Sequence, residues 1–185
     1  FASAMRNSHG AEEVSSWELR QTAEQMERSA ELLKDEIKAN LSIRRIPDKV
    51  LHTPARLVPE NHEVKNLLLG MRQVMRELGG VGIAAPQVGI SLRLFVMSYE
   101  GFNLSVINPT IRDLQGLNTE AEGCLSIPGS FYKLHRAESL TLSGFNHLWD
   151  PFEVNLSGFL ARIAQHEMDH LDGVTIDSRS GGVYA

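Results

Sequence analysis

The chain has 185 residues, of which 42% are hydrophobic and 22% are charged, which is enough for one packed domain with an appendage. A formal net charge of −5, with no run of basic residues, argues against direct nucleic-acid binding, because that affinity comes largely from Lys and Arg side chains that neutralise phosphates. No apolar run approaches the roughly 20 residues that span a bilayer and no secretory signal is recognisable, so we expect a soluble protein.

Residues 1–41 are predicted to form a leader and an amphipathic helical arm. The first ten residues have no periodic pattern, and we expect an unstructured leader there. Ser15 and Glu18 have the spacing of a capping box, and from Leu19 to Ile37 apolar side chains recur at alternating steps of four and three. Two of the six positions in this seam are alanine, which makes a weak coiled coil. The helix is therefore expected to pack on its own domain or on a neighbouring molecule, and an oligomer through this helix is one of these outcomes.

Residues 42–185 are predicted to form a single domain that begins with an extended, turning segment. Three prolines punctuate residues 42–60. Residues 62–78 place seven apolar side chains on one helical face, and Gly79 and Gly80 are expected to end this helix.

Four later stretches have the composition of β-strands separated by turn residues. They are residues 92–99, 104–111, 139–145 and 152–158, and a final helix is predicted over residues 158–171. Strands that follow one another with few helices between them pair antiparallel more readily than parallel. The sequence therefore predicts an α+β fold with antiparallel or mixed sheets.

The last predicted helix contains the sequence QHEMDH at residues 165–170. His166 and His170 are four residues apart, so both imidazoles lie on one face of the helix, and Glu167 follows the first of them. This H-E-x-x-H arrangement can hold a divalent metal with a carboxylate close to its water, although a helix whose histidines bind no metal is the alternative.

A third ligand is required, and the sequence leaves two sources open. No His or Glu follows His170, so a downstream ligand would have to be Asp172 or Asp177. Upstream, Cys124 is the single cysteine of the chain and lies in the sequence EGCLSIP. Two histidines with one thiolate leave an open position for water, which is typical of catalytic metal sites, whereas an inert buried thiol is the alternative for an isolated cysteine. A single cysteine also excludes an intrachain disulfide and favours a reducing compartment.

Three stretches in this order resemble the signature motifs of the peptide deformylase family: GVGIAAPQ at residues 80–87, EGCLS at 122–126 and QHEMDH at 165–170. The resemblance begins near residue 42, ends near residue 177 and does not cover the arm. It implies that residues 42–185 form a metal-dependent hydrolase that removes the N-formyl group from the N-terminal formyl-methionine of newly made polypeptides and releases formate. It also implies sheets packed around a central metal-binding helix.

The resemblance further implies a role for individual residues. One divalent ion would bind three side chains, those of Cys124, His166 and His170. Fe²⁺ is the expected native metal, with Zn²⁺, Ni²⁺ or Co²⁺ as alternatives in the purified protein. Glu167 would transfer the proton of the attacking water, and Gln87 together with the backbone N–H of Leu125 would stabilise the oxyanion.

An extended formyl-methionyl peptide is expected to lie in the site like an added strand. Its backbone partners would be Val81, Gly82 and Gly123, where glycines leave the backbone accessible. The partners of such an enzyme are nascent chains near the ribosome, in the cytoplasm of a bacterium or in the matrix of a mitochondrion or plastid.

Four further positions bear on the expected site. Glu122 and Arg136 match an acidic residue and an arginine that pair in the family, so we expect a buried ion pair supporting the cysteine loop; a surface pair is the alternative. Phe131 stands where many bacterial members have an arginine that holds the peptide, and Arg162 stands where many have an apolar residue lining the methionine pocket. Both changes are expected to weaken substrate binding rather than chemistry; the alternative is that Arg162 points into a surface ion pair and Phe131 only packs.

Two functions besides a deformylase fit the same residues. One is a metallopeptidase that uses the two motif histidines and a downstream aspartate, and the other is a metal-binding relative with weak or no catalysis. Five other histidines have no partner at ligand spacing, and we expect them to be structural or exposed: His9, His52, His62, His135 and His147.

Deletion of residues 1–40 tests the predicted arm. An isolated helix of this length is marginal in water, so a stable arm needs a surface to pack on. We expect the deletion to lower the melting temperature or to change the sedimentation coefficient beyond the loss of mass, with metal content retained. Unchanged melting and unchanged association would show that the arm packs on nothing.

Overall fold

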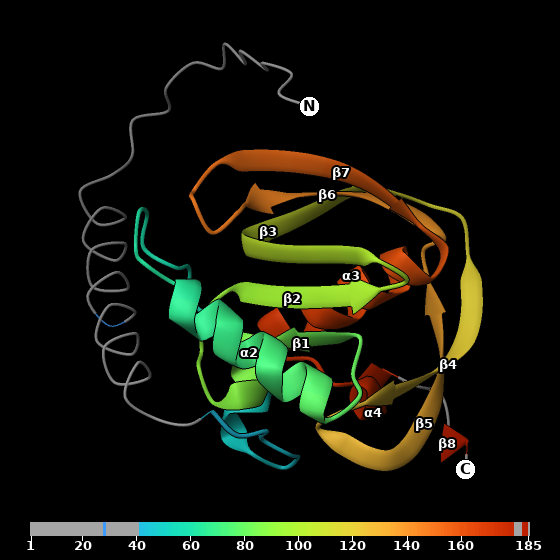
Figure 1. Cartoon of the computed structure of the whole chain (residues 1–185). Helices are drawn as coiled ribbons and strands as arrows, with labels where there is room; N and C mark the ends of the chain where they lie inside the picture. The colour runs from blue at the N-terminus through green and yellow to red at the C-terminus, as the bar shows by residue number, and fades with distance from the viewer. Residues whose placement is uncertain (1–27, 29–40, 180–182, 185) are drawn as a thin grey trace, which may run out of the picture.

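The computed structural model describes residue 28, residues 41–179 and residues 183–184 (Figure 1). The predicted arm falls almost wholly outside these residues, so its helix and its packing stay predictions. Within the described part of the chain, no helix is long and apolar enough to cross a membrane.

Two antiparallel sheets form the framework. The larger one has the spatial order β1-β2-β3-β6-β7 and the smaller one the order β4-β5-β8. The larger sheet contains β1 (Gly82–Ala84), β2 (Leu94–Tyr99), β3 (Phe102–Gln115), β6 (Ser139–Phe145) and β7 (Pro151–Ser157). The smaller sheet contains β4 (Asn118–Cys124), β5 (Ile127–Arg136) and β8 (Val183–Tyr184). The predicted α+β class with antiparallel pairing is confirmed.

Helices cover both faces of the larger sheet. Helix α2 (Lys65–Glu77) packs on one face, and α3 (Gly158–Leu171) packs on the other, between the two sheets (Figure 1). Shorter helical turns connect the framework: η1 (Lys49–His52), η2 (Ala85–Val88) and α4 (Ile176–Arg179).

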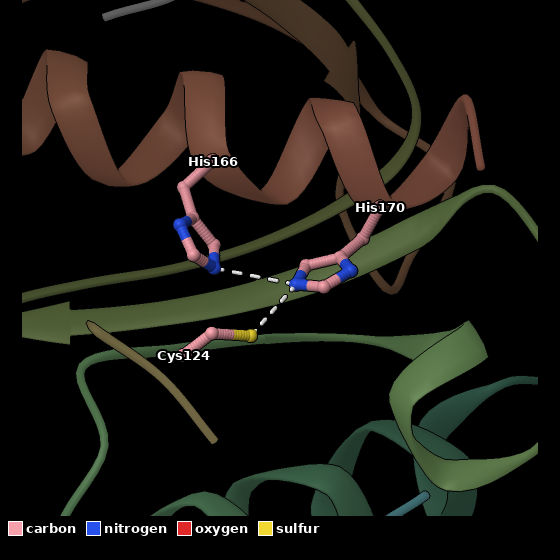
Figure 2. Close-up of side chains that lie close together, drawn as sticks. All are labelled: Cys124, His166 and His170. Atoms are coloured by element: carbon pink, nitrogen blue, oxygen red, sulfur yellow. Dashed lines mark hydrogen bonds between the residues drawn. The ribbon is translucent and has the colours of Figure 1, made fainter. Parts of the chain in front are cut away.

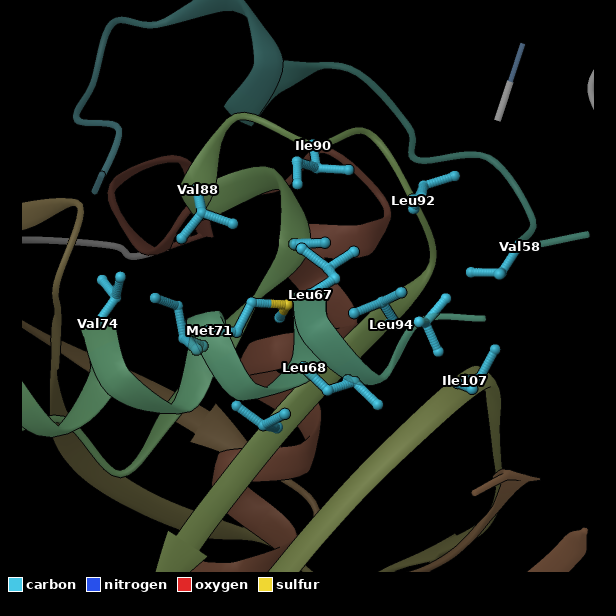
Figure 3. Packing of buried hydrophobic residues seen from close by; sticks show 14 of the residues in the cluster. Val58, Leu67, Leu68, Met71, Val74, Val88, Ile90, Leu92, Leu94 and Ile107 are labelled. Atoms are coloured by element: carbon cyan, nitrogen blue, oxygen red, sulfur yellow. The ribbon is translucent and has the colours of Figure 1, made fainter. Parts of the chain in front are cut away.

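The first four residues of β2 are buried on both faces of the strand, which explains their uninterrupted apolar sequence. Leu94 and Val96 join the apolar cluster around α2, which also contains Met71 (Figure 3). Phe95 and Met97 join the cluster around α3. This alternation follows from the two-residue period of a strand, and it ties both helices to one central strand.

The β4–β5 hairpin is absent from the elements expected from the sequence. Its two-residue turn, Leu125 and Ser126, contains neither Gly nor Asn, and Pro128 lies inside β5, so the usual turn and strand signals are missing. The ladder shifts register between Gly123 and Cys124, because three residues of β5, 128–130, have no partner on β4. The regular ladder is therefore interrupted directly beside the cysteine.

Residues 41–58 connect the two sheets by backbone hydrogen bonds. The N–H of Arg44 donates to the carbonyl of Gln87 at 2.6 Å, and the N–H of Ile46 donates to the carbonyl of Ser126 at 3.2 Å. The extended, turning course predicted from the prolines is confirmed, with a turn at residues 46–47 and the helical turn η1 within this segment. Its backbone therefore fixes the η2 loop relative to the cysteine hairpin.

The predicted helices and strands are confirmed with shifted ends. The helix expected at 62–78 is α2, and the helix expected at 158–171 is α3. After α2, Gly79 adopts a φ of 67°, as expected of a helix-ending glycine. Strand β3 extends beyond the predicted residues 104–111, because its polar last residues still pair with β6 although they are exposed.

Replacing two glycines of similar φ separates the cost of backbone strain from the cost of a steric clash. Gly173 (φ 74°) follows α3, and a Cβ there would lie 2.9 Å from the carbonyl carbon of Thr53, whereas Gly101 (φ 80°) has no neighbour within 4 Å of that position. We expect Gly101→Ala to lower the free energy of unfolding by about 1–2 kcal/mol, and Gly173→Ala to lower it by a further roughly 1–3 kcal/mol because backbone must move. Urea denaturation measures both losses, and equal losses would contradict the packing argument.

Candidate metal centre

Three side chains from two elements converge on one point. His166 and His170 lie one turn apart on α3, and Cys124 is the last residue of β4 (Figure 2). The Nε2 atoms of the two histidines are 3.2 Å apart, and Sγ of Cys124 lies 3.3 Å from Nε2 of His170. All three donor atoms lie within 4.8 Å of one another. Residue spacing alone left the third ligand open and the family resemblance implied Cys124, and the fold brings this cysteine to the histidines.

These distances suit a common metal ion. Ligand atoms about 2.0–2.3 Å from one tetrahedral ion are themselves about 3.3–3.6 Å apart. The Nε2–Nε2 and Sγ–Nε2 distances lie close to this range. A thiolate with two imidazoles is also a donor set that borderline-soft divalent metals prefer. The residues present therefore fit the metal that the motifs imply.

Neither downstream aspartate reaches the histidines. Asp172 accepts a hydrogen bond from Arg93 at 3.0 Å near the surface, and Asp177 accepts one from Thr175. Among the described residues, no group containing either aspartate could hold a metal ion. The metallopeptidase alternative, which needs a downstream aspartate, is therefore not supported.

Glu122 is a buried carboxylate that orients one histidine ring. Its Oε2 lies 2.9 Å from Nδ1 of His166, so the ring turns its Nε2 toward the cysteine. Arg136 donates to both carboxylate oxygens at 2.8 and 2.9 Å, and both side chains are buried, so the predicted ion pair is confirmed. Burial raises the pKa of Glu122, but the hydrogen bonds from Arg136 and His166 outweigh it and hold the pKa well below its ordinary value. The carboxylate is therefore charged at neutral pH.

The two histidines have opposite pKa shifts from the protein groups around them. Burial lowers the pKa of His166, but hydrogen bonds to Cys124 and Glu122 outweigh it and raise the pKa to about 10. Burial, and then repulsion from His166, lowers the pKa of His170 well below its ordinary value. Because ligands bind a metal in their deprotonated form, His166 would have to lose a proton before it could serve as a metal ligand.

Glu167 lines the same cavity as His166 and Cys124, and β1 is shaped around it. Its Oε2 is buried and has no hydrogen-bond partner among the described residues. Burial is the largest cause that raises the pKa of Glu167 to about 7. A Cβ on Gly82 would lie 2.5 Å from Oε1 of Glu167 and 3.0 Å from the Ile163 side chain. Gly82 therefore makes room for this carboxylate, a reason for the glycine that differs from the substrate contact expected from the sequence.

Gln87 directs its amide nitrogen toward the cysteine hairpin. Its Oε1 accepts the backbone N–H of Ala84 at 2.9 Å. Its Nε2 donates to Oγ of Ser126 at 3.2 Å and approaches Sγ of Cys124 at 3.7 Å. Leu125 follows the cysteine in the hairpin turn and lines the same cavity. A side-chain donor and a backbone N–H are thus found next to the converging donor atoms.

A cavity of about 400 Å³ opens beside the metal-ligand candidates. It lies between β1, an edge strand of the larger sheet, and β4, an edge strand of the smaller sheet. The three positions expected to contact substrate all line it: Val81, Gly82 and Gly123. Its apolar wall is formed by five side chains, those of Leu125, Ile127, Phe131, Phe159 and Ile163.

Phe131 is half-exposed at the side of this cavity, over the backbone of Gly123. A ring carbon of Phe131 lies 3.0 Å from the position that a Cβ on Gly123 would take. The ring offers apolar surface where an arginine would donate hydrogen bonds. The expected loss of substrate affinity stays a prediction. If it is right, the variant Phe131→Arg should have a lower KM than wild type at the same kcat.

Arg162 also lines the cavity, but it is buried, with 4% of its surface exposed. Its Nη1 donates to Oε1 of Glu122 at 2.6 Å. The alternative in which Arg162 points into a surface ion pair is therefore wrong. The guanidinium is held within the protein rather than free at the rim of the pocket.

The other described histidines take no part in the metal-ligand group. His135 shares a hydrogen bond of 2.6 Å with Oγ1 of Thr119, and the carbonyl of His62 accepts the indole N–H of Trp149. His52 and His147 are exposed. The prediction that these four are structural or exposed is confirmed, and His9 lies outside the described residues.

Sequence reasoning missed the ion pairs of Asp169. Arg136 donates to its Oδ2 at 2.6 Å, and Arg179 donates to both of its carboxylate oxygens at 2.6 and 2.7 Å. An acidic residue in a helix buried between two sheets is a signal for a cationic partner. The identity of that partner depends on packing between distant segments, which periodicity does not reveal.

Comparison with known proteins agrees with this geometry. The family model described as polypeptide deformylase matches residues 40–181. A peptide deformylase from Acidothermus cellulolyticus is 41% identical over 138 residues, which cover 74% of this chain and 77% of the relative.

Solved structures with the same arrangement include two bacterial peptide deformylases. The crystal structure from Thermotoga maritima has a TM-score of 0.75 at 38% identity, covering 78% of this chain and 99% of that chain. The structure from Synechococcus elongatus, in complex with actinonin, has a TM-score of 0.74 at 39% identity, covering 78% of this chain and 81% of that one.

Replacement of the cysteine tests the metal site directly. We expect Cys124→Ala to lower metal content and activity together while most of the fold remains, because the other two donors alone hold an ion weakly. Elemental analysis and circular dichroism of the purified variant measure both. Full metal content with full activity would show that Cys124 is an inert thiol and not a metal ligand.

Proposed function

Because this chain belongs to the polypeptide deformylase family, we propose how its cleft removes the N-formyl group from formyl-methionyl peptides. The observation that carries the proposal is the convergence of three donor atoms, Sγ of Cys124 and Nε2 of His166 and His170, in a cavity that Glu167 also lines. In the reaction, the oxygen of water adds to the formyl carbon and the C–N bond breaks. The products are formate and a free methionine N-terminus.

Cys124, His166 and His170 hold one divalent ion. When bound, the ion supplies a Lewis acid that lowers the pKa of water toward about 7. A cysteine with two histidines accepts Fe²⁺, Zn²⁺, Ni²⁺ or Co²⁺, and cellular supply rather than affinity selects among them. Fe²⁺ is the native ion on this proposal, and metal analysis after anaerobic purification identifies it.

Glu167 moves the proton in this mechanism. Its carboxylate takes a proton from the attacking water and delivers it to the nitrogen of the leaving amine. A pKa near neutrality suits both steps, because the group must accept a proton and then release it, and burial raises the pKa of Glu167 to about 7. Oε2 has no hydrogen-bond partner among the described residues, so no such bond competes for this acceptor.

Gln87 and Leu125 stabilise the charge that develops on the formyl oxygen. The amide of Gln87 is held by the N–H of Ala84, so its Nε2 is already oriented before substrate arrives. The backbone N–H of Leu125 is the second donor. Loss of one such donor typically costs about 3 kcal/mol of transition-state stabilisation.

The substrate binds as an extended strand between the two sheets. β1 and β4 are edge strands that flank the cavity, so a peptide placed there can pair with backbone at Val81 and Gly82 on one side and at Gly123 on the other. The methionine side chain then packs against the apolar wall of the cavity near Phe159 and Ile163. These contacts hold the formyl group against the metal-ligand residues.

The natural partners follow from the chemistry of the substrate. Formylated chains are made where translation begins with formyl-methionine, in the bacterial cytoplasm or in an organelle matrix. Relatives from bacteria at about 40% identity support the first of these sources. Nascent chains near the ribosome are then the substrates, and cosedimentation with ribosomes translating a formylated chain tests this placement.

Formate release from a formyl-methionyl tripeptide tests the reaction. We expect wild type to release formate and to leave the unformylated tripeptide intact. Glu167→Gln should lower kcat by about 10²–10⁴ with metal retained, because the amide keeps the shape of the carboxylate but accepts no proton. Unchanged turnover in a metal-replete Glu167→Gln sample would remove Glu167 from this role. Cleavage of the unformylated peptide would point instead to a metallopeptidase, and bound metal without either reaction to an inactive relative.

A further inference from the structure

The three proposed metal ligands come from two elements that must be held in register. His166 and His170 lie on α3, whereas Cys124 lies on the β4–β5 hairpin of the smaller sheet. A small shift of α3 along the hairpin would separate the thiol from the imidazoles. The side chains that join α3 to the hairpin therefore decide the geometry of the site.

Arg162 is one of these side chains, and all of its described polar contacts lead to the hairpin. It lies on α3 one turn before His166. Its Nη1 donates to Glu122 at 2.6 Å, and its Nη2 donates to both the carbonyl and the side-chain oxygen of Asn118 at 2.9 Å. Longer contacts of 3.4 Å reach the carbonyl of Leu134 on β5. One buried guanidinium thus spans both strands of the hairpin that carries Cys124.

The carboxylate of Glu122 has two donors on each oxygen. Oε1 accepts from Arg136 and Arg162, and Oε2 accepts from Arg136 and lies 2.9 Å from Nδ1 of His166. Without Arg162, Oε1 would keep only its donor from Arg136, so the carboxylate that orients His166 would lose its hydrogen bond to α3. His170 offers no substitute, because its Nδ1 is buried without a hydrogen-bond partner among the described residues.

Arg136 makes the reverse connection. It lies on β5 of the hairpin and donates to Asp169 of α3 at 2.6 Å, in addition to its bonds with Glu122. Each element therefore sends one arginine to a carboxylate of the other element, and Glu122 is shared by both arginines. This reciprocal arrangement opposes sliding of α3 in either direction.

We propose that Arg162 is a positioning residue for the metal site, which fixes Glu122, and through it the His166 ring, and locks α3 to the hairpin that carries Cys124. The proposal rests on the proposed assignment of Cys124, His166 and His170 as metal ligands. It gives Arg162 a different role from the one its place in the cavity wall suggests. A wall residue would affect the binding of the methionine side chain, whereas a positioning residue affects the metal and kcat.

The planar guanidinium is what this role requires. An arginine presents several N–H groups in a fixed fork, so it can donate to a carboxylate and to a neighbouring strand together. A lysine carries the same charge on a single nitrogen and cannot span Glu122 and Asn118 in the same geometry. Arg162→Lys should therefore restore only part of the function that Arg162→Met removes.

Co²⁺ binding to the full-length protein tests the proposal, because Co²⁺ bound to thiolate and imidazole has an absorption spectrum that depends on ligand geometry. We expect Arg162→Met to weaken Co²⁺ affinity by about 10–100-fold, measured by chelator competition at fixed pH, and to alter the thiolate-to-metal absorption. At saturating Co²⁺, kcat on a formyl-methionyl tripeptide should fall while KM changes little. Arg162→Lys should lie between Arg162→Met and wild type.

Arg112→Met is the matched control. Arg112 on β3 forms an ion pair of 2.6 Å with Glu153 on β7, is about half-exposed, and does not line the cavity. It should keep wild-type Co²⁺ affinity, spectrum and kinetics. If Arg162→Met does not fold, Arg162→Lys decides: weaker affinity and an altered spectrum at an unchanged melting temperature support the proposal.

Wild-type Co²⁺ affinity and spectrum in a folded Arg162→Met or Arg162→Lys protein would overturn the proposal, and a raised KM alone would show that Arg162 is only a wall of the pocket. Failure of the proposed function is distinguishable from this result. It would appear as wild-type protein that binds Co²⁺ but releases no formate, and the affinity comparison among the variants would still decide the role of Arg162.

Discussion

The buried carboxylate of Glu122 joins the parts of the molecule on which the metal-ligand candidates lie. It accepts hydrogen bonds from Arg136 of its own hairpin and from Arg162 of helix α3, and it orients His166 of the same helix. A buried charge is costly unless it is paired and hydrogen-bonded, and breaking such a pair typically costs about 3–5 kcal/mol. Because the donors come from both the hairpin and α3, the hydrogen bonds that stabilise the Glu122 charge also hold α3 at a fixed distance from the hairpin. The same principle explains Glu167, which is equally buried without a cation bound to it and has a raised pKa.

The cleft depends on how two sheet edges meet beside one helix. Edge strands expose unpaired backbone groups, which proteins usually cover or blunt. Here β1 and β4 turn such edges toward a shared cavity, and α3 supplies the reactive side chains between them. Gly82 on β1 lacks a Cβ where the carboxylate of Glu167 needs space, and the β4–β5 ladder shifts register beside Cys124, with the extra residues on β5. The missing side chain of Gly82 and the register shift beside Cys124 thus shape the site between the two strand edges.

Much of the fold could be predicted from the sequence, because long amphipathic periods and apolar runs are local signals. Helices α2 and α3 and strand β2 show them clearly. The β4–β5 hairpin does not, because β4 contains few apolar residues, Pro128 lies inside β5, and the turn, Leu125 and Ser126, lacks the residues that favour such turns. The strand that carries the cysteine was therefore the least predictable element near the site.

The sequence by itself determined that His166 and His170 share one helical face beside Glu167, because the helix period places residues four apart together. The three sequence motifs and their order also identified the family. Residue spacing alone did not choose between Cys124 and a downstream aspartate, and the tertiary structure brings Cys124, the residue that the family resemblance implied, to the histidines. Only the tertiary structure decided that Arg162 turns inward to Glu122. The physical reason is that contacts between segments some forty residues apart depend on how a helix and a hairpin pack, and no local period carries that information.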